Sequence, residues 1–554
     1  MTSGIPSAPN RGSDGPRQRR GLRRRDIEAL ASPDAYPYDR SAARKLETIQ
    51  THLSYVFLTA ERVYKFRKAV DLAFVHFTTR DERNADCLRE VALNRRLAPD
   101  VYVGVAPLLR VRGGVRVGPV AQHLSAAARD AEHCVVMRRL PAGGDALSLL
   151  RSGRLGDRQI DRLARLVARF HVRSALGVPA PFTPDAWRAR CTAPVRANLA
   201  ALAHTSRSVA PRDVLDPLRA TCRDFERAYA DRFERRRAAG RAVDGHGDLH
   251  LQHVWYEDAS GDPVVIDCLE FSPSLRRIDA ASDVAFLAMD LAYRGASALA
   301  ARFLRTYAAE SDDFDLFALV DYFISYRAAV RAKVAALVAC DAEIGAGQRE
   351  GAAQSARRHL LLAQRSLAPR GRGRLVLVSG VVGSGKSTVA AALADDLEAV
   401  VISSDRVRKH LLGLPPDARA DTEAYGAGQK ARVYEGLLAR AAPVVASGRA
   451  AILDATFSAR CERARALDWA RGRGVPAFLV HTRCAPEVAL ERLARRAREG
   501  GDASDAGPAL YHASAAAFEP PTEWPGDTQI TLITDGPTWR SELREAAKAR
   551  LHVA

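Results

Sequence analysis

The sequence has little of several features that would place it in a class at once. It has no run of 18 apolar residues, so we expect no membrane-spanning helix. Its eight cysteines are scattered and form no CxxC pair, which excludes a cysteine-rich metal site and is typical of a reduced, cytoplasmic chain. Aromatic residues make up only 6% of the chain, and basic residues do not alternate with them as in a single-stranded nucleic-acid surface.

Lysine is also scarce. There are eight lysines among 83 basic residues, and the formal net charge is +18. We attribute the arginine excess to a coding bias along the whole chain, so the charge favours a solvated basic surface and we do not expect a nucleic-acid partner. Arginines cluster between Arg17 and Arg25, and no apolar segment follows them, so we expect no export signal. Residues 1–34 are predicted to be a disordered basic tail.

The rest of the chain divides into two predicted domains, residues 35–366 and 374–554, with a linker at 367–373 that contains Pro369 and two glycines. The first domain starts with short strands and continues with long helices, which predicts an α+β fold. Its early elements are predicted as strands His52–Thr59, Arg62–Lys68 and Cys134–Leu140, a helix Asp86–Leu97 and a hairpin Val101–Val117. In the second domain strands and helices alternate, which predicts an α/β fold with a parallel, doubly wound sheet.

A strong motif stands at Gly380–Ser387, between a predicted strand Leu375–Ser379 and a predicted helix Lys386–Leu397. Its sequence, GVVGSGKS, fits the phosphate-binding pattern G-x-x-x-x-G-K-[ST]. Glycines let consecutive N–H groups face a polyphosphate, Lys386 adds a positive charge, and the Ser387 hydroxyl can ligate Mg²⁺. The residues expected to bind ATP here are Gly380, Gly383, Ser384, Gly385, Lys386, Ser387 and Thr388.

Two aspartates follow strands of the same domain. Asp405 comes after the predicted strand Val400–Ser403, and Asp454 ends the predicted strand Ala450–Asp454. Ligands bind beyond the carboxyl ends of such strands, so one aspartate could accept a proton from a hydroxyl while the other holds Mg²⁺ through water. The alternative for each is a helix cap. Downstream, Arg492 and Arg496 share a helix face and either close over a phosphoryl group or form a solvated surface.

These motifs resemble the small P-loop kinases, a group that includes gluconate kinase, chloramphenicol phosphotransferase, polynucleotide kinase and zeta-toxin relatives. The resemblance covers about residues 374–535 and rests on Gly380–Thr388, Ser404-Asp405-Arg406, Leu453–Phe457 and Glu491-Arg492-Leu493. It implies phosphoryl transfer to a hydroxyl, with Asp405 as the base and Arg492 and Arg496 as lid arginines. It does not identify the acceptor.

A second constellation lies in the first domain. Asp248 stands in a short loop, His246–His253, and Asp267 ends an apolar segment about twenty residues later. Asp248 could orient and deprotonate a hydroxyl, and Asp267 could hold Mg²⁺ on ATP. Lys65 on a predicted strand and Glu90 on a predicted helix form the pair that positions ATP phosphates in protein-kinase-like folds. We expect His246 to brace the loop backbone.

This set resembles the aminoglycoside phosphotransferase family, also called the choline/fructosamine kinase-like group, over about residues 36–365. Together the two domains are similar to bacterial bifunctional proteins that join such a domain to a P-loop kinase. The resemblance implies a protein-kinase-like fold and a metal ligand five residues after Asp248. The family has asparagine there, but this chain has His253, and imidazole is a poor Mg²⁺ ligand. Glu270 or water could complete the shell, or the domain could bind ligand with little catalysis.

We therefore expect a cytoplasmic, ATP- and Mg²⁺-dependent phosphotransferase that acts on a hydroxyl of a small molecule. One alternative is a regulatory or sensing ATP-binding protein, which His253 favours. Another is a nucleic-acid end kinase, favoured only by charge. The sequence indicates neither the acceptor nor the oligomeric state.

Overall fold

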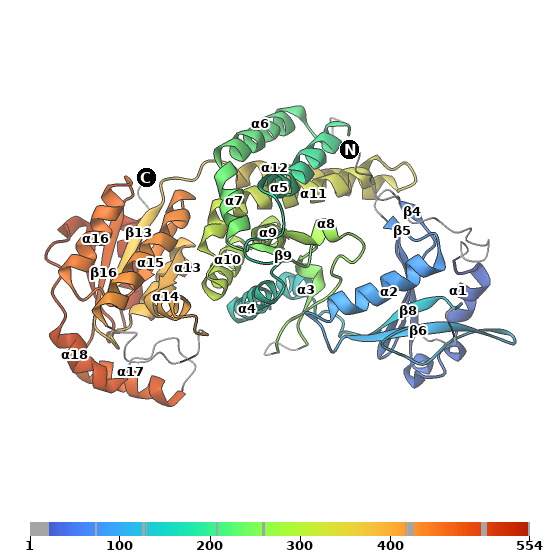
Figure 1. Cartoon of the computed structure of the whole chain (residues 1–554), viewed down its shortest axis with the longest axis horizontal. Coiled ribbons are helices and arrows are strands. Elements are labelled where there is room, and N and C mark those ends of the chain that lie inside the picture. The colour runs from blue at the N-terminus through green and yellow to red at the C-terminus, as the bar shows by residue number, and fades with distance from the viewer. Residues whose placement is uncertain are drawn as a thin grey trace, which may run out of the picture. The chain divides into compact units, whose positions relative to one another are not determined.

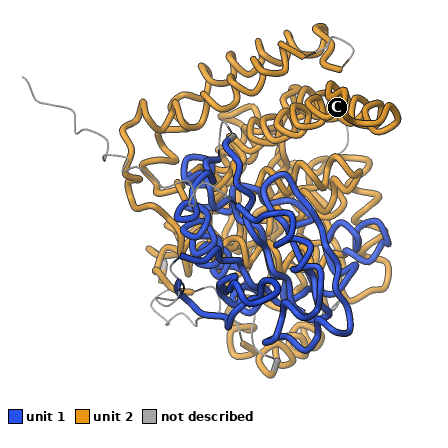
Figure 2. Tube along the Cα trace, turned by 90° about the vertical axis from the view of Figure 1, so that its right-hand side faces the viewer, with its two compact units in different colours: residues 1–155, 244–277 blue, residues 156–243, 278–554 orange. Residues whose placement is uncertain are grey.

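The computed structural model describes residues 21–551 except for 73–74, 125–127, 129, 206–208, 258–260, 416–417, 419–425 and 500–506. It divides into two compact units, residues 1–155 with 244–277 (unit 1) and residues 156–243 with 278–554 (unit 2) (Figure 2). These units, which are defined by contacts within the fold, do not coincide with the two domains predicted from the sequence. The predicted domain boundaries therefore stay a prediction. Within the described residues, no helix combines the length and the apolarity that crossing a bilayer requires.

Unit 1 is built on a six-stranded sheet in the order β1-β2-β3-β8-β6-β7, with every neighbouring pair antiparallel (Figure 1). Its strands are β1 (Leu46–Gln50), β2 (Ser54–Thr59), β3 (Arg62–Arg67), β6 (Tyr102–Val111), β7 (Gly114–Val117) and β8 (His133–Arg138). The predicted strand pair is confirmed as β2 and β3, the predicted hairpin as β6 and β7, and the strand after Cys134 as β8. The antiparallel sheet places Lys65 on β3, directly beside Val135 of β8.

Helix α2 (Arg80–Asn94) packs against β6 and β8 and carries Glu90. The prediction that this helix starts at Asp86 is wrong, because the helix begins six residues earlier, at Arg80. A capping box sets the true start: Glu82 donates its backbone N–H to the Thr79 hydroxyl at 3.2 Å, and Thr79 donates its own to the Glu82 carboxylate at 2.9 Å. The residues of α2 before Asp86 are mostly polar, so the spacing of apolar residues alone did not indicate that they are helical.

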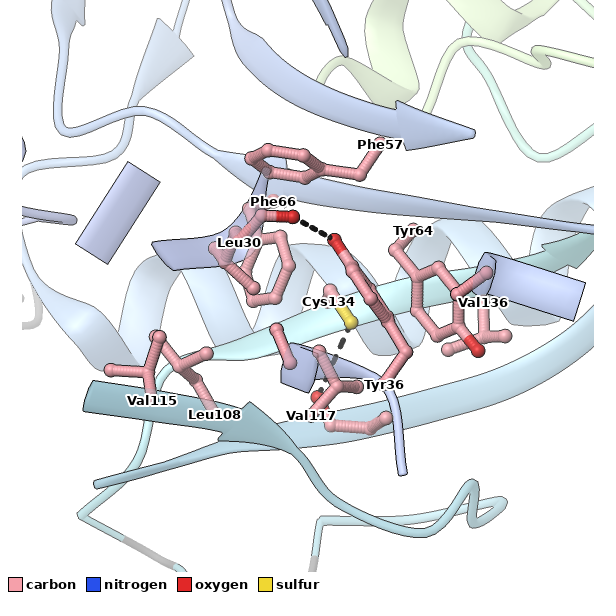
Figure 3. Close-up of a cluster of buried hydrophobic side chains, with 13 residues drawn as sticks. Leu30, Tyr36, Phe57, Tyr64, Phe66, Leu108, Val115, Val117, Cys134 and Val136 are labelled. Carbon is pink, nitrogen blue, oxygen red and sulfur yellow. Dashed lines mark hydrogen bonds between the residues drawn. The ribbon is translucent and has the colours of Figure 1, made fainter. Parts of the chain in front are cut away.

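The prediction of a disordered tail to residue 34 is wrong for its last part. Residues 24–30 form helix α1 (Arg24–Leu30), and Leu30 is buried in a core cluster with Tyr36, Phe57 and Phe66 (Figure 3). The Tyr36 hydroxyl donates to the Leu30 carbonyl at 2.8 Å. Apolar residues spaced for one helix face outweigh the local charge here. Residues 1–20 lie outside the described residues.

Short elements complete unit 1 and carry its loop of acids and histidines. They are η1 (Pro33–Ala35), η2 (Arg40–Ala43), β4 (Asp71–Leu72), β5 (Val75–His76), α3 (Ala146–Arg151), η4 (Leu251–His253), β10 (Val254–Trp255), β11 (Val264–Val265) and α8 (Pro273–Arg276). The 3-10 turn η4 and the antiparallel pair β10 and β11 hold the loop between residues 246 and 267 in place.

The helical part of unit 2 contains long helices, as predicted. They are α4 (Asp157–Arg173), α5 (Pro184–Ala203), α6 (Arg212–Ala228), α7 (Ala230–Ala238), α9 (Ala280–Tyr293), α10 (Ser297–Ser311), η5 (Phe314–Ala318), α11 (Val320–Cys340) and α12 (Ala346–Ser366). Two short strands, β9 (Ala242–Asp244) and β12 (Arg277–Asp279), lie at the unit boundaries. Helix α11 packs along α12, and α9 is almost wholly buried.

The C-terminal part of unit 2 is a five-stranded sheet in the order β14-β15-β13-β16-β17, and its neighbouring strands are all parallel. The predicted parallel sheet is thereby confirmed. Its strands are β13 (Arg374–Ser379), β14 (Val400–Ser403), β15 (Ala450–Asp454), β16 (Ala477–Arg483) and β17 (Gln529–Ile533). Its helices are α13 (Lys386–Leu397), α14 (Ser404–Leu411), α15 (Ala427–Ala446), α16 (Arg460–Arg471), α17 (Pro486–Glu499), η7 (Pro508–Leu510), α18 (Tyr511–Ala516), η8 (Gly526–Thr528) and α19 (Trp539–Arg550).

Strand β13 lies at the centre of this sheet and is buried on both faces. Val376 and Val378 pack with α13 and α19 in one core cluster, while the alternate residues Leu375 and Leu377 are equally buried. Because β14, β15 and β13 are neighbours and parallel, their carboxyl ends meet at one edge. Asp454 is in register with Ser403 of β14 and Val378 of β13, so the edge gathers the segments that carry the predicted site.

Candidate functional site

The loop between β13 and α13 has the shape that the motif predicts. Gly380 has φ 154° and Gly383 has φ 80°, and a Cβ on Gly380 would lie 2.4 Å from the Thr482 hydroxyl. Only glycine fits these two positions without displacing β16 or α17. The Ser384 hydroxyl lies 2.7 Å from the Thr482 hydroxyl, which ties the loop to the sheet. The loop is therefore held in its curled shape by its glycines and by this contact with β16.

Lys386 is the first residue of α13, and its ammonium group lies against the loop. Its Nζ donates to the Val381 carbonyl at 2.8 Å. Burial lowers the pKa of Lys386, and the nearby carboxylates of Asp454 and Asp405 offset this effect only in part. A phosphate group in this loop would restore that lost stabilisation of the charge, which is the behaviour expected of a phosphate-binding lysine.

A cavity of about 320 Å³ lies beside the loop and brings six predicted residues together. Its lining includes Gly383, Lys386, Ser387, Asp405, Asp454 and Arg496. Asp405 is in the first turn of α14, and Asp454 is 7% exposed at the end of β15. Residues that the sequence did not single out also line this cavity, among them Arg408, Lys430 and Tyr434.

Arg408 fixes the position of Asp405. It donates from Nη1 to Asp405 Oδ1 at 2.6 Å, one helical turn away. The i, i+3 spacing on α14 is the signal that could have predicted this pair. The contact fixes the orientation of the Asp405 carboxylate, and a carboxylate held in this way can accept a proton from a hydroxyl.

A second cavity, of about 440 Å³, lies on the other side of Lys386 and Ser387. Arg492 lines this cavity with Gly385, Thr388 and Trp539, and it does not line the cavity of the two aspartates. It donates to the Thr534 hydroxyl at 3.0 Å and to the Thr534 carbonyl at 2.8 Å. Thr534 also donates to the Ser384 carbonyl at 2.8 Å. No local sequence signal pointed to Thr534, which lies 42 residues from Arg492.

Arg492 and Arg496 therefore differ, although they share one helix face. Arg496 lines both cavities, and Arg492 lines only the second. The predicted residues thus differ in the cavity that they line: Asp405 and Asp454 line only the first and Arg492 and Thr388 only the second, whereas Lys386, Ser387 and Arg496 line both.

In unit 1 the structure brings together the predicted lysine, glutamate and aspartate. Lys65 Nζ lies 3.0 Å from Glu90 Oε1 and 3.2 Å from Asp267 Oδ1. Burial opposes the lysine charge, but Asp267 and Glu90 outweigh it and raise the pKa of Lys65. Lys65 in turn holds the pKa of Asp267 well below its ordinary value. The three groups are joined in one chain of ion pairs.

Arg67 extends this chain into the core, and the sequence analysis missed it. Its Nη2 lies 2.7 Å from Asp86, 2.5 Å from Glu90 and 2.6 Å from Glu270. Arg67 follows Lys65 by two residues on β3, so both side chains emerge from the same face, and that spacing could have predicted the pair. Burial raises the pKa of Glu270 to about 7, against the attraction of Arg67. Glu270 is thus engaged by Arg67, away from the metal role considered for it.

The loop that starts at His246 is braced as predicted. His246 Nε2 lies 2.9 Å from the Ile266 carbonyl, and the Asp248 N–H donates to His246 Nδ1 at 3.3 Å. Burial raises the pKa of Asp248, but the hydrogen bond with His250 and the nearby imidazoles lower it to about 2. The rings of His250 and His253 are 3.8 Å apart between centroids. Burial and the neighbouring His250 lower the pKa of His253.

The two sites differ in how they suit Mg²⁺. Beside the phosphate loop the donors are oxygens, namely the Ser387 hydroxyl and the carboxylates of Asp405 and Asp454, and Mg²⁺ prefers oxygen ligands. In unit 1, Asp267 offers an oxygen, but His253 presents an imidazole nitrogen at the second predicted ligand position. The C-terminal site fits Mg²⁺, and the N-terminal site does not.

Comparison with known proteins adds the following findings. The family model described as AAA domain matches residues 375–521. The uncharacterized protein Rv2004c of Mycobacterium tuberculosis and the uncharacterized protein Mb2027c of Mycobacterium bovis are each 34% identical over 518 residues, which cover 90% of this chain and 94% of theirs.

Two solved structures are similar over part of the chain. A gluconokinase from Sinorhizobium meliloti is 21% identical, with 33% of this chain and 93% of that chain covered and a TM-score of 0.24. A choline/ethanolamine kinase family protein from Mesorhizobium loti is 15% identical, with 61% of this chain and 98% of that chain covered and a TM-score of 0.35.

Proposed function

The chain belongs to the family of the mycobacterial proteins Rv2004c and Mb2027c, and we propose that it is an ATP-dependent phosphotransferase whose C-terminal domain phosphorylates a hydroxyl of a small molecule. One observation carries this proposal: Lys386, Ser387, Asp405 and Asp454 line a single cavity. A cation for the transferred phosphate and a carboxylate for the attacking hydroxyl are the parts that phosphoryl transfer needs.

Asp405 is proposed as the base. It takes the proton from the acceptor hydroxyl as that oxygen attacks the γ-phosphorus, the bond to the β,γ-bridging oxygen breaks, and ADP leaves with the electron pair. Arg408 keeps the Asp405 carboxylate oriented for this step. Lys386 and Arg496 stabilise the negative charge on the transferred group. Ser387 and Asp454 would hold Mg²⁺, which when bound neutralises charge on the phosphates.

Arg492 is proposed to act at the nucleotide end of the site. Its two hydrogen bonds to Thr534 tie α17 to the phosphate loop through the Ser384 carbonyl. This arrangement supports a role in positioning the bound nucleotide, while Arg496 lines the cavity of the two acids as well as that of Arg492.

We propose a second ATP site in unit 1. The chain of contacts from Glu90 through Lys65 to Asp267 supports it, because this is the arrangement that positions ATP phosphates in protein-kinase-like folds. Asp248 is proposed as the base of this site. A ligand-binding domain without catalysis is the second candidate for unit 1, and the histidine at position 253 favours it.

The test of the C-terminal function is acceptor-dependent ADP formation. The purified chain is incubated with Mg·ATP and a panel of polyols, sugars, sugar acids and amino alcohols, and ADP is measured with and without each compound. We expect at least one compound to raise ADP formation well above the rate in water, and Lys386→Ala to abolish this rise. Equal rates with every compound and with water would leave an ATPase and remove the proposal.

A further inference from the structure

Four side chains with metal-binding atoms converge in the loop between residues 246 and 267 of unit 1. One ligand atom each from Asp248, His250 and His253 lie within 4.8 Å of one another. His253 Nε2 also lies 3.4 Å from Asp267 Oδ2. Two imidazoles beside two carboxylates form a mixed nitrogen and oxygen donor set, unlike the all-oxygen set beside the phosphate loop of unit 2.

The orientation of His253 is set by the backbone. Its Nδ1 lies 2.9 Å from the carbonyl oxygen of Asp248. A carbonyl can only accept, so the proton of the neutral ring is on Nδ1 and the lone pair is on Nε2. Metal-ligating histidines typically donate their other ring N–H to a carbonyl or carboxylate in this way. The lone pair of His253 is therefore directed to the side on which Asp267 lies.

Asp267 is held as firmly as His253. Its backbone adopts φ 62°, in the left-handed region, and its N–H donates to the Tyr102 hydroxyl at 3.1 Å. The next residue, Cys268, donates its N–H to the Asn94 side chain at 2.8 Å. Lys65 occupies the Oδ1 atom, so Oδ2 is the oxygen that faces His253. Such backbone strain is found where a site is pre-organised for a ligand.

Two acceptor atoms that face each other repel unless a cation lies between them. Two ligands of a tetrahedral metal ion, each about 2.0–2.1 Å from it, are roughly 3.4 Å apart. The separation of His253 Nε2 and Asp267 Oδ2 is 3.4 Å. His250 does not belong to this pair: its Nδ1 accepts from the Gln252 N–H at 3.3 Å, and its Nε2 lies 3.6 Å from Asp248 Oδ2. It orients Asp248, which stands next to the pair.

We propose that the N-terminal site binds a divalent transition-metal ion that accepts nitrogen ligands, of the Zn²⁺ or Co²⁺ type, through His253 Nε2 and Asp267 Oδ2. Imidazole suits these ions, whereas Mg²⁺ requires oxygens in octahedral geometry. Two protein ligands leave open positions, and phosphate oxygens of a nucleotide can fill them. Only the binding of nucleotide phosphates to the metal rests on the proposed second ATP site. Metal binding by His253 and Asp267 itself needs no phosphoryl transfer.

The experiment uses the untagged full-length chain and Co²⁺ as the probe, without nucleotide. Visible absorption of Co²⁺ is followed during titration, and Mg²⁺ is then added in large excess. We expect a band of nitrogen-ligated Co²⁺ at one equivalent per chain that Mg²⁺ does not displace. His253→Ala and Asp267→Asn should each lower the Co²⁺ affinity by at least roughly tenfold. His253→Asn, which supplies an amide oxygen, should let Mg²⁺ compete.

The matched control is His52→Asn, because His52 is an exposed histidine of the same unit and should leave the titration unchanged. Unaltered Co²⁺ affinity in His253→Ala would overturn the proposal, and so would complete displacement by Mg²⁺. A thiolate–cobalt charge-transfer band would assign the metal to the exposed Cys340 or Cys461 and would also overturn it. A chain that binds Co²⁺ as predicted but transfers no phosphoryl group would contradict the proposed function alone.

Discussion

At the scale of single residues, Asp405 has the role that can be tested most simply. It is oriented by Arg408 and lies in the cavity beside Lys386. Asp405→Asn removes the base but keeps the size of the side chain, so we expect kcat to fall by roughly 10²–10⁴. ATP affinity should stay within about threefold, because Lys386 and the loop N–H groups hold the phosphates. Steady-state kinetics and nucleotide titration measure the two effects separately.

The control for this variant is Asp468→Asn. Asp468 is an exposed residue of α16 that pairs only with Arg471 among the described residues. It should change neither kcat nor ATP affinity. If Asp405→Asn also kept its full rate, Asp405 would not be the base, and Asp454 would be the base to examine.

Glu270 should make the stability of the chain depend on pH. Burial raises its pKa from 4.5 to about 7, so between these values the unfolded chain releases a proton that the folded chain retains. This contribution to stability is complete below pH 4.5 and is lost as pH rises through about 7. Glu270→Gln keeps the shape of the side chain and removes the ionisation. As pH rises from 4.5 to about 7, the free energy of unfolding of the parent chain should fall by an amount on the order of 1–3 kcal/mol, and that of Glu270→Gln should not.

Thermal unfolding midpoints at a series of pH values measure this difference. Glu435→Gln serves as the control, because Glu435 is exposed and pairs with Arg465 at the surface. If the unfolding midpoint of Glu270→Gln depended on pH as that of the parent does, other groups would cause the dependence. Asp86 would be the first of these to test, because burial raises its pKa too.

At the scale of elements, α2 depends on the capping box that fixes its start and thereby the position of Glu90. Thr79→Ala removes the hydroxyl that accepts the Glu82 N–H, so we expect a loss of about 1 kcal/mol in the stability of this helix. Faster amide exchange in its first turn should accompany the loss. Thr538→Ala is the matched control, since Thr538 precedes α19 without a side-chain capping bond. If Thr79→Ala changed amide exchange in the first turn of α2 no more than Thr538→Ala changes it in α19, packing alone would hold the start of α2.

The elements of the α/β domain that the sequence analysis gave bounds for, namely β13, α13, β14 and β15, could be predicted to within one residue, and the reasons are local. Each of these three strands is a short apolar run that ends in serine or aspartate, and the motif fixes the start of α13. Elements whose boundaries depend on polar contacts were harder to predict, as the early start of α2 shows. Helix α1 could not be predicted because Leu30 gains its burial from Tyr36 and Phe57, which belong to later elements.

The candidate site could be predicted as far as motifs carry it. The proximity of Asp405, Asp454 and Lys386 could be predicted, because each lies just beyond or at the end of a parallel strand. Neighbouring parallel strands bring such residues together whatever the conformation of their side chains. The separation of Arg492 from Arg496 could not be predicted, since it depends on Thr534 of a distant segment. The pairing of His253 with Asp267 also needed the structure, because a tautomer is fixed by a hydrogen bond and not by spacing.

At the scale of the whole molecule, the chain should bind two nucleotides. Lys386 and Lys65 each stand at one proposed site, and lysine is scarce in this chain. Calorimetric titration with a non-hydrolysable ATP analogue should give two equivalents per chain. Lys386→Ala should reduce this to one and leave the second affinity unchanged, and Lys65→Ala should have the converse effect. One equivalent in the parent chain would mean that unit 1 binds another ligand.

The central claim is that the C-terminal domain moves a phosphoryl group from ATP to a hydroxyl other than that of water. The measurement that tests it most directly is the fate of a label on the γ-phosphate of ATP, with an acceptor that raises ADP formation and with Asp405→Asn beside the parent chain. We predict that the parent transfers the label to the acceptor, seen by mass spectrometry as one added phosphate, and that Asp405→Asn does not. Label found only in inorganic phosphate would contradict the claim, and label transferred equally by both chains would contradict the assignment of Asp405 as the base.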